Sequence, residues 1–157
     1  MKIAIGSDHA GFYLKEDIIK YLEEKNIEVK DMGPFDDGRV DYPDYGHAVG
    51  HEVIDKKMDF GIVICGSGIG ISISANKVKG IRAALCSEPY SARLARRHND
   101  ANVLAMGARL IGHDMALEIV DAFLDEKFEG GRHINRVNKI EEEENGIHNN
   151  KASTNWS

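Results

Sequence analysis

Residues 59–70 read DFGIVICGSGIG, an apolar run that passes into three glycines at alternate positions, with Cys65 at the junction. The apolar run is too short for a helix and is typical of a strand buried in a parallel sheet. Glycines permit positive φ angles and close backbone approach, so their position directly after the strand indicates a tight loop. The stretch therefore predicts a buried strand that opens into a loop at its carboxyl end.

Four other runs along the chain have the character of strands: residues 2–6, 27–33, 81–87 and 102–107. Helical patterns lie between the strands. Residues 9–26 place Leu14, Ile18 and Leu22 on one apolar face, and residues 44–57 predict a second helix. Strands that alternate with helices imply right-handed crossovers and a parallel sheet. We therefore expect an α/β protein, a Rossmann-like three-layer αβα sandwich with a five-stranded parallel sheet.

The composition suits one compact domain, because the chain has 157 residues, of which 42% are hydrophobic and 29% charged. We expect this domain to span residues 1–146, with a last helix over residues 130–145 that stops at Gly146. Residues 147–157 are polar and lack periodicity, which predicts a disordered tail.

The charge of the chain excludes some classes of partner. A formal net charge of -6 argues against a nucleic-acid binder, so any anion site must be a local cluster of cations. The chain has two cysteines far apart, no apolar signal region and no long apolar span. These features predict a cytoplasmic protein with reduced thiols and no membrane partner.

Reactive side chains follow the predicted strands at their carboxyl ends, where open parallel sheets bind ligands. Asp8 and His9 follow the first strand, Cys65 ends the third, and Arg109 follows the fifth. We expect several of these side chains to share one crevice. Asp8 has a second interpretation, because its carboxylate could simply cap the helix that follows.

Cys65 precedes five residues whose amides can point into that crevice: Gly66, Ser67, Gly68, Ile69 and Gly70. Such a group of amides attracts negative charge and lowers the pKa of a thiol, which makes Cys65 a candidate base or nucleophile. The alternative is a small core cysteine beside a tight turn. The G-x-G-x-G spacing is not the dinucleotide fingerprint, and no Walker lysine follows it, so the loop does not favour an NAD or ATP site.

Two arginines near the end of the chain form a candidate anion site. Arg132 and Arg136 are four residues apart and therefore lie on one face of the last predicted helix. Two guanidinium groups on one face can converge on a phosphate or a carboxylate. The alternative is a solvated helix face with ordinary ion pairs.

The histidines give weaker signals. His98 and Asn99 lie at a helix end, where a histidine can titrate near neutral pH. His47 and His51 have the i,i+4 spacing of metal ligands, but no third ligand is evident in the sequence, so we predict no metal site.

Five segments of the chain, taken together and in order, resemble the type B ribose-5-phosphate isomerase family: GSDHAG, DYPDY, ICGSGIGISISANK, GIRAALCSEPYSARLARRHNDANVLAMGAR and EGGRHINRV. Several segments in order are far more specific than any one motif, and the resemblance covers nearly the whole chain. It implies a sugar-phosphate isomerase that needs no metal or other cofactor. Relatives with the same fold isomerise galactose 6-phosphate or allose 6-phosphate, so the resemblance indicates the reaction better than the sugar.

The resemblance implies that the chain interconverts ribose 5-phosphate and ribulose 5-phosphate through a cis-enediolate. Cys65 would be the base that moves a proton between C2 and C1 of the open-chain sugar. The amides of residues 66–70, with Ser67, would stabilise the enediolate oxygen. His98 would open the furanose ring, Asn99 would hold the sugar, and Asp8 would bind its hydroxyls or relay protons among them.

The resemblance also implies how the phosphate is held and how the chains assemble. The phosphate would be bound by four side chains, those of His9, Arg109, Arg132 and Arg136. In this family each site is built by two chains, with the region of His98, Asn99 and Arg109 reaching over from the neighbour. We therefore expect a homodimer with shared active sites, which can pair further into a tetramer, and a nearly inactive single subunit.

Two positions depart from the family's pattern. Some members use a glutamate base where this chain has Ile71, with glycine in place of Cys65, so the chain resembles the cysteine-base branch. Ser67 stands where close relatives often carry threonine, and the smaller side chain could admit six-carbon sugars. The alternative functions are an isomerase of allose or galactose 6-phosphate and a non-catalytic phosphosugar sensor.

Overall fold

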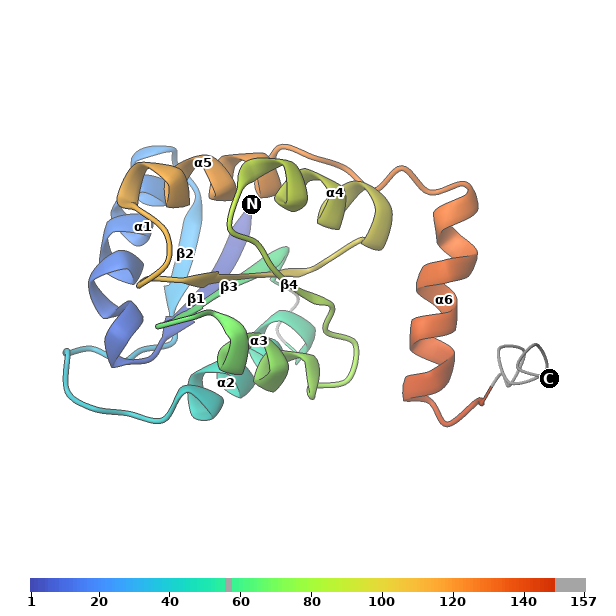
Figure 1. Cartoon of the computed structure of the whole chain (residues 1–157), viewed down its shortest axis with the longest axis horizontal. Helices are drawn as coiled ribbons and strands as arrows, with labels where there is room; N and C mark the ends of the chain where they lie inside the picture. Colours follow the sequence, from blue (N-terminus) through green and yellow to red (C-terminus); the bar gives the residue numbers. More distant parts are fainter. Residues whose placement is uncertain (56–57, 149–157) are drawn as a thin grey trace.

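The computed structural model describes residues 1–55 and 58–148, in which a parallel sheet lies between two layers of helices (Figure 1). The strands are β1 (Lys2–Ser7), β2 (Glu28–Asp31), β3 (Phe60–Cys65), β4 (Ala83–Leu85) and β5 (Val103–Gly107). They lie in the order β2-β1-β3-β5-β4, and each neighbouring pair is parallel. The predicted five-stranded parallel sheet and αβα architecture are confirmed.

The helices cover both faces of the sheet. A 3-10 turn (His9–Gly11) precedes α1 (Phe12–Glu24), and the later helices are α2 (Tyr42–Asp55), α3 (Ile69–Asn76), α4 (Pro89–Asn99), α5 (His113–Leu124) and α6 (Arg132–Glu144). Helices α1, α4 and α5 pack on one face, and α2 and α3 pack on the other (Figure 1). Within the described ranges, no helix is both long and apolar enough to cross a membrane.

The central strand β3 is anchored on both faces. Ile62 and Ile64 pack into the core beneath α1, α4 and α5, whereas Val63 and Cys65 pack into the core against α2 and α3. Successive side chains of a strand point to opposite faces, which is why one apolar run serves both cores. Full burial of an aliphatic side chain of this size contributes about 1.5–3 kcal/mol. The strand therefore presents its carboxyl end, with Cys65, from a rigid support.

Two of the strands are shorter than the sequence predicts, although backbone hydrogen bonds to the neighbouring strands continue just past them, as from the Met32 N–H to the Ile5 carbonyl (2.7 Å). The run 27–33 forms a strand only over Glu28–Asp31, and the Asp31 carboxylate accepts the N–H of Gly33 (2.8 Å). The run 81–87 forms a strand only over Ala83–Leu85. At the start of this strand, the N–H of Ala83 donates to the Asn76 side chain (2.8 Å).

The last helix stops where the sequence predicts. Helix α6 ends at Glu144, and Gly146 follows with a φ of 78°. The N–H of Gly146 donates to the Glu143 carbonyl (3.0 Å), and that of Ile147 donates to the Glu142 carbonyl (2.8 Å). These two bonds satisfy the last carbonyls of the helix. The disordered tail expected over residues 147–157 lies, from residue 149 onward, outside the described residues.

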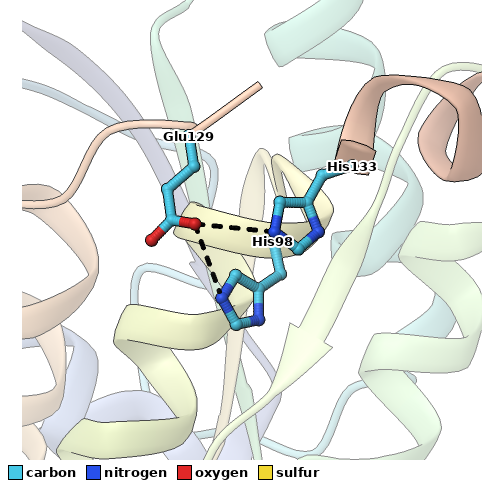
Figure 2. A group of neighbouring side chains, drawn as sticks. All are labelled: His98, Glu129 and His133. Carbon is cyan, nitrogen blue, oxygen red and sulfur yellow. Dashed lines mark ion pairs between the residues drawn. The ribbon is translucent and has the colours of Figure 1, made fainter. Parts of the chain in front are cut away.

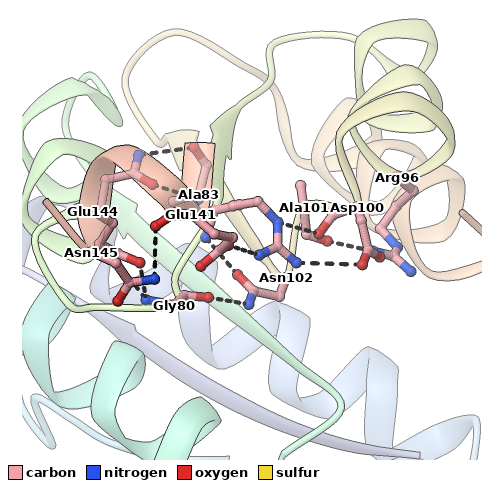
Figure 3. A network of polar contacts seen from close by, with 11 residues as sticks. Gly80, Ala83, Arg96, Asp100, Ala101, Asn102, Glu141, Glu144 and Asn145 are labelled. Carbon is pink, nitrogen blue, oxygen red and sulfur yellow. Dashed lines mark hydrogen bonds and ion pairs between the residues drawn. The ribbon is translucent and has the colours of Figure 1, made fainter. Parts of the chain in front are cut away.

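Helix α6 stands away from the two layers and is tied to the body by polar contacts (Figures 1 and 3). The Arg82 guanidinium pairs with Glu141 of α6 and with Asp100 at the end of α4. The Glu144 carboxylate accepts the N–H of Gly80 (2.9 Å). These contacts leave much of the helix surface, including Arg132 and Arg136, exposed.

Candidate active site

A cavity of about 490 Å³ opens at the carboxyl ends of β1, β3 and β5. It is lined by Asp8, Tyr42, Cys65, Gly66, Ser67, Ile69, Gly70, Arg109 and Leu110. The parallel sheet brings the ends of these strands to one edge, and the crossover connections begin there. The prediction that side chains following separate strands share one crevice is therefore confirmed for Asp8, Cys65 and Arg109.

Cys65 is the last residue of β3 and lies at the floor of this cavity with 4% of its surface exposed. The N–H of Gly68 donates to its Sγ, at 3.1 Å. An N–H that points at sulfur stabilises negative charge on it. The loop thus supplies a donor to the one atom that a thiol base would use.

Cys86 shows what an ordinary core cysteine looks like in the same fold. It is 2% exposed and does not line the cavity at Cys65. Burial, with a smaller contribution from the Glu88 carboxylate, raises the pKa of the Cys86 thiol to about 11. A thiol in that setting stays protonated and unreactive at neutral pH.

The glycines of the loop are required by space as well as by conformation. Gly68 has a φ of 77°, and a Cβ there would lie 2.5 Å from Leu85 Cδ1 and 2.7 Å from the backbone of Met106. A Cβ on Gly70 would lie 2.6 Å from the Tyr42 ring. The loop therefore runs close between β5 and the start of α2, and α3 begins directly after it at Ile69.

We expect Gly68→Ala to lower both stability and activity. The positive φ and the backbone contact cannot be relieved by a rotamer change, so the free energy of unfolding should fall by about 1–3 kcal/mol. Gly146→Ala is the matched control, since its φ is 78° but nothing lies within 4 Å of the added Cβ. Urea unfolding compares the two variants. Equal losses would show that only backbone strain, and not loop packing, is at work.

Asp8 both lines the cavity and caps the turn that follows it, the two positions that the sequence leaves open. Its Oδ1 accepts the N–H groups of Ala10 (2.9 Å) and Gly11 (3.1 Å), so it caps the turn before α1. The side chain is buried but still lines the cavity beside Cys65. The two backbone donors fix the position of its carboxylate, which leaves its other oxygen available to a ligand.

A second cavity, of about 620 Å³, adjoins the first at Arg109 and holds His9. Its lining is His9, Arg39, Val40, Asp41, Asp44, Tyr45 and Arg109. The His9 Nδ1 lies 3.2 Å from the Val40 carbonyl oxygen, so the loop before α2 positions the ring. Sequence reasoning gave no role to Arg39 or Tyr42, although the quoted segment DYPDY lies at this loop and contains Tyr42.

The structure places Arg109 beside the glycine loop of its own chain. The guanidinium belongs to the cavity of its own chain, because a Cβ on Gly66 would lie 3.0 Å from Arg109 Nη1. Its place in the fold explains this, since Arg109 follows β5, the strand that pairs with β3. That the region of Arg109 also reaches a neighbouring chain stays a prediction.

Four other predicted site residues lie outside both cavities of this chain. His98 and Asn99 end α4, and Arg132 and Arg136 lie on the exposed surface of α6. His98 stacks instead on His133, with ring centroids 4.4 Å apart, beside the Glu129 carboxylate (Figure 2). One chain therefore holds the predicted base and the predicted ring-opening histidine in different places.

The positions of three other residues bear on two alternatives, a base at residue 71 and a metal site on α2. Ile71 is fully buried in the core against α2 and offers no proton-transferring group beside Cys65. His47 and His51 lie on the exposed face of α2. Among the described residues, the histidine and carboxylate cluster compact enough to share an ion is His98, Glu129 and His133, and it excludes both.

Comparison with known proteins decides the family. The family model described as Ribose/Galactose Isomerase matches residues 3–140. The chain belongs to the ribose/galactose isomerase family. The resemblance found in the sequence is confirmed, and membership of the ribose/galactose isomerase family makes the chain an isomerase by class.

Individual members of the ribose/galactose isomerase family agree over nearly the full length. Ribose-5-phosphate isomerase B of Escherichia coli is 54% identical over 139 residues, which is 88% of this chain and 93% of that protein. The structure of ribose-5-phosphate isomerase B from Clostridium thermocellum has a TM-score of 0.92 and 53% identity, and the match covers 94% of this chain and 100% of that one. A Mycoplasma genitalium ribose-5-phosphate isomerase B, solved with bound ribulose-5-phosphate, has a TM-score of 0.87 and 44% identity over 92% of this chain and 96% of that one.

Proposed function

We propose that the chain interconverts ribose 5-phosphate and ribulose 5-phosphate without a cofactor, with Cys65 as the base. The observation that carries the proposal is the hydrogen bond from the Gly68 N–H to Cys65 Sγ, 3.1 Å long, at a cavity floor. A sensor that only bound a phosphosugar would have no use for a thiol placed in this way. The Mycoplasma genitalium relative with bound ribulose-5-phosphate supports a five-carbon substrate.

In the proposed proton transfer, the Cys65 sulfur at the start of this loop acts as the base. The Cys65 thiolate removes the proton from C2 of the open-chain aldose, and the electron pair moves onto the C1 carbonyl oxygen to give a cis-enediolate. The same sulfur then returns the proton to C1, while the proton on O2 passes to O1 and the carbonyl forms at C2. General-base catalysis of this kind contributes about 10²–10⁴-fold.

The loop after Cys65 is placed to stabilise the enediolate. Four residues of this loop line the cavity at the start of α3: Gly66, Ser67, Ile69 and Gly70. Backbone N–H groups at the start of a helix have no partner within the helix. The Ser67 Oγ accepts the Ile69 N–H at 3.2 Å, which holds its hydroxyl at the cavity wall. Donors fixed before the reaction stabilise the developing oxyanion without reorganisation.

We infer that a complete site needs a second copy of the chain. The cavity at Cys65 has two of the predicted phosphate-binding side chains, Arg109 and the adjoining His9. Arg132, Arg136 and His98 lie elsewhere on the same chain. A homodimer that brings the α4 and α6 surface of one copy over the cavity of the other would unite them.

The surface around the cavity supports this assembly. Eight large apolar side chains between the start of α3 and the end of α6 are exposed: Ile69, Ile73, Leu85, Tyr90, Leu110, Met115, Ile134 and Ile140. Ile69 itself lines the cavity at Cys65. A protein surface with several exposed apolar side chains beside its site is typical of one that another chain covers. Two such dimers pairing into a tetramer remains a prediction.

The proposed function is tested with a panel of sugar phosphates. We expect the highest kcat/KM for ribose 5-phosphate, and lower values for allose 6-phosphate and galactose 6-phosphate. A higher kcat/KM for a six-carbon sugar would mean that this sugar is the substrate, with the same mechanism. Binding of all these sugars without conversion of any would leave the sensor as the function.

Ser67 is the residue that we expect to affect the choice of sugar. Ser67→Thr keeps the hydroxyl and adds one methyl group to the cavity wall, so it should lower kcat/KM for allose 6-phosphate more than that for ribose 5-phosphate. One methyl group in a pocket changes such a ratio by about tenfold. The measurement is the ratio of the two kcat/KM values in both proteins, and an unchanged ratio rules the volume argument out.

Two broader features also belong to the proposal. We propose that residues 1–146 act as a single isomerase domain, since both cores are built on the one sheet. The cytoplasmic location predicted from the sequence stays a prediction.

A further inference from the structure

The cluster of His98, Glu129 and His133 lies outside both cavities of its own chain (Figure 2). The His98 and His133 rings stack with an angle of 11° between their planes. Glu129 Oε2 lies 3.8 Å from His98 Nε2 and 3.5 Å from His133 Nε2. One carboxylate oxygen therefore faces both imidazoles.

Glu129 is itself held firmly against the end of α4. Its Oε1 accepts the Arg97 Nε at 2.7 Å, and its backbone N–H donates to the Arg97 carbonyl at 3.0 Å. Burial acts to raise the pKa of Glu129, but the hydrogen bond and charge of Arg97, with the two histidines, outweigh it and hold that pKa below its usual range. The carboxylate is thus charged and fixed in place next to His98.

The two histidines differ in their access to solvent. The His133 side chain is 8% exposed, whereas that of His98 is 36% exposed and can reach a ligand outside this chain. Burial, followed by the positive charges of His98 and Arg132, lowers the pKa of His133. The Glu129 carboxylate therefore lies beside one buried ring, that of His133, and one accessible ring, that of His98.

We propose that Glu129 is a positioning residue that holds the His98 ring, against the His133 ring, in the orientation that opens the furanose. This rests on the proposed function. In the step concerned, the C1–O4 bond of ribose 5-phosphate breaks, its electron pair goes to O4, O4 takes a proton from His98, and the C1 hydroxyl gives its proton to water.

The same cluster is less suited to a metal ion. A zinc ion needs nitrogen lone pairs that converge on one point about 2.0–2.1 Å away. The lone pairs of two stacked imidazoles lie in the ring planes, and because these planes are nearly parallel, the lone pairs do not converge on one point. A shared carboxylate fits this arrangement without any rotation of the rings.

The test uses two reactions that differ in their need for ring opening. Conversion of ribose 5-phosphate starts from the furanose. Exchange of the C1 protons of ribulose 5-phosphate with D₂O starts from an open chain, because its O5 carries the phosphate and cannot close a furanose on C2. Both are followed by NMR with the full chain as it assembles in solution.

We expect Glu129→Gln to lower the conversion of ribose 5-phosphate about 10-fold to 100-fold, less than loss of a general acid itself. Proton exchange of ribulose 5-phosphate should stay within about twofold, because the enediolate step does not use His98. Glu126→Gln is the matched control. Glu126 also pairs with Arg97, at 3.8 Å, but does not contact His98, so both rates should be retained.

Other outcomes overturn the proposal in distinguishable ways. Equal loss of both rates in Glu129→Gln would mean that Glu129 acts through folding or assembly. Retention of both rates would mean that it does nothing for His98. Loss of the wild-type activity on dialysis against EDTA would assign the cluster to a metal. If the wild-type protein catalyses neither reaction, the proposed function is wrong, and this inference, which rests on it, is wrong as well.

Discussion

Replacing Cys65 with alanine should lower kcat for ribose 5-phosphate by about 10²–10⁴-fold, the range that a general base contributes. The Gly68 N–H that donates to Cys65 Sγ, 3.1 Å away, loses its acceptor, but the loop backbone is held by its own glycines and by β3. Stability should therefore change little. Steady-state kinetics measures the first effect, and thermal unfolding measures the second.

Cys86→Ala is the control for the loss of a buried thiol. Cys86 is as buried as Cys65 but lies away from the cavity, and its thiol pKa is raised to about 11. We expect kcat of this variant to stay within about twofold of the wild-type value. Retention of more than about one tenth of the activity by Cys65→Ala would remove the cysteine from the mechanism.

Mixing two inactive variants should restore activity if each site is built by two chains. Cys65→Ala removes the base from one side of the site, and His98→Gln removes the ring-opening group that we place on the other side. After subunit exchange at equal concentrations, half of the dimers are mixed, and each mixed dimer has one intact site. Activity should therefore rise to about one quarter of the wild-type value.

The matched control mixes Cys65→Ala with Asp8→Asn. These two residues line the same cavity of one chain, so every site in a mixed dimer carries one defect. This mixture should stay inactive. Restoration in both mixtures, or in neither, would contradict a site shared between two chains, because only the first pair lies on opposite sides of it.

The part of the site that could be predicted from the sequence is the part that the sheet assembles. Apolar runs followed by Asp8, Cys65 and Arg109 specify strands with reactive ends, and a parallel sheet brings those ends to one edge. The three glycines indicated the tight loop after Cys65, and the close contacts of Gly68 explain why glycine is needed there.

Other parts of the site depend on chain paths that local patterns do not specify. Tyr42 reaches the cavity because the loop before α2 folds back to Gly70. Glu129 meets His98 because the segment after α5 returns to the end of α4, 31 residues away in sequence. Arg109 was expected from the resemblance to reach a neighbouring chain, and pairing of β5 with β3 also places it in the cavity of its own chain.

The central claim is that one sulfur carries a proton between C2 and C1 within a loop of backbone donors. Its most direct test is the conversion of ribulose 5-phosphate to ribose 5-phosphate in D₂O, with deuterium at C2 of the product measured by NMR. We predict deuterium at C2 with the wild-type protein and none above background with Cys65→Ala. Equal incorporation by both proteins, or product formed by Cys65→Ala at the wild-type rate, would contradict the account.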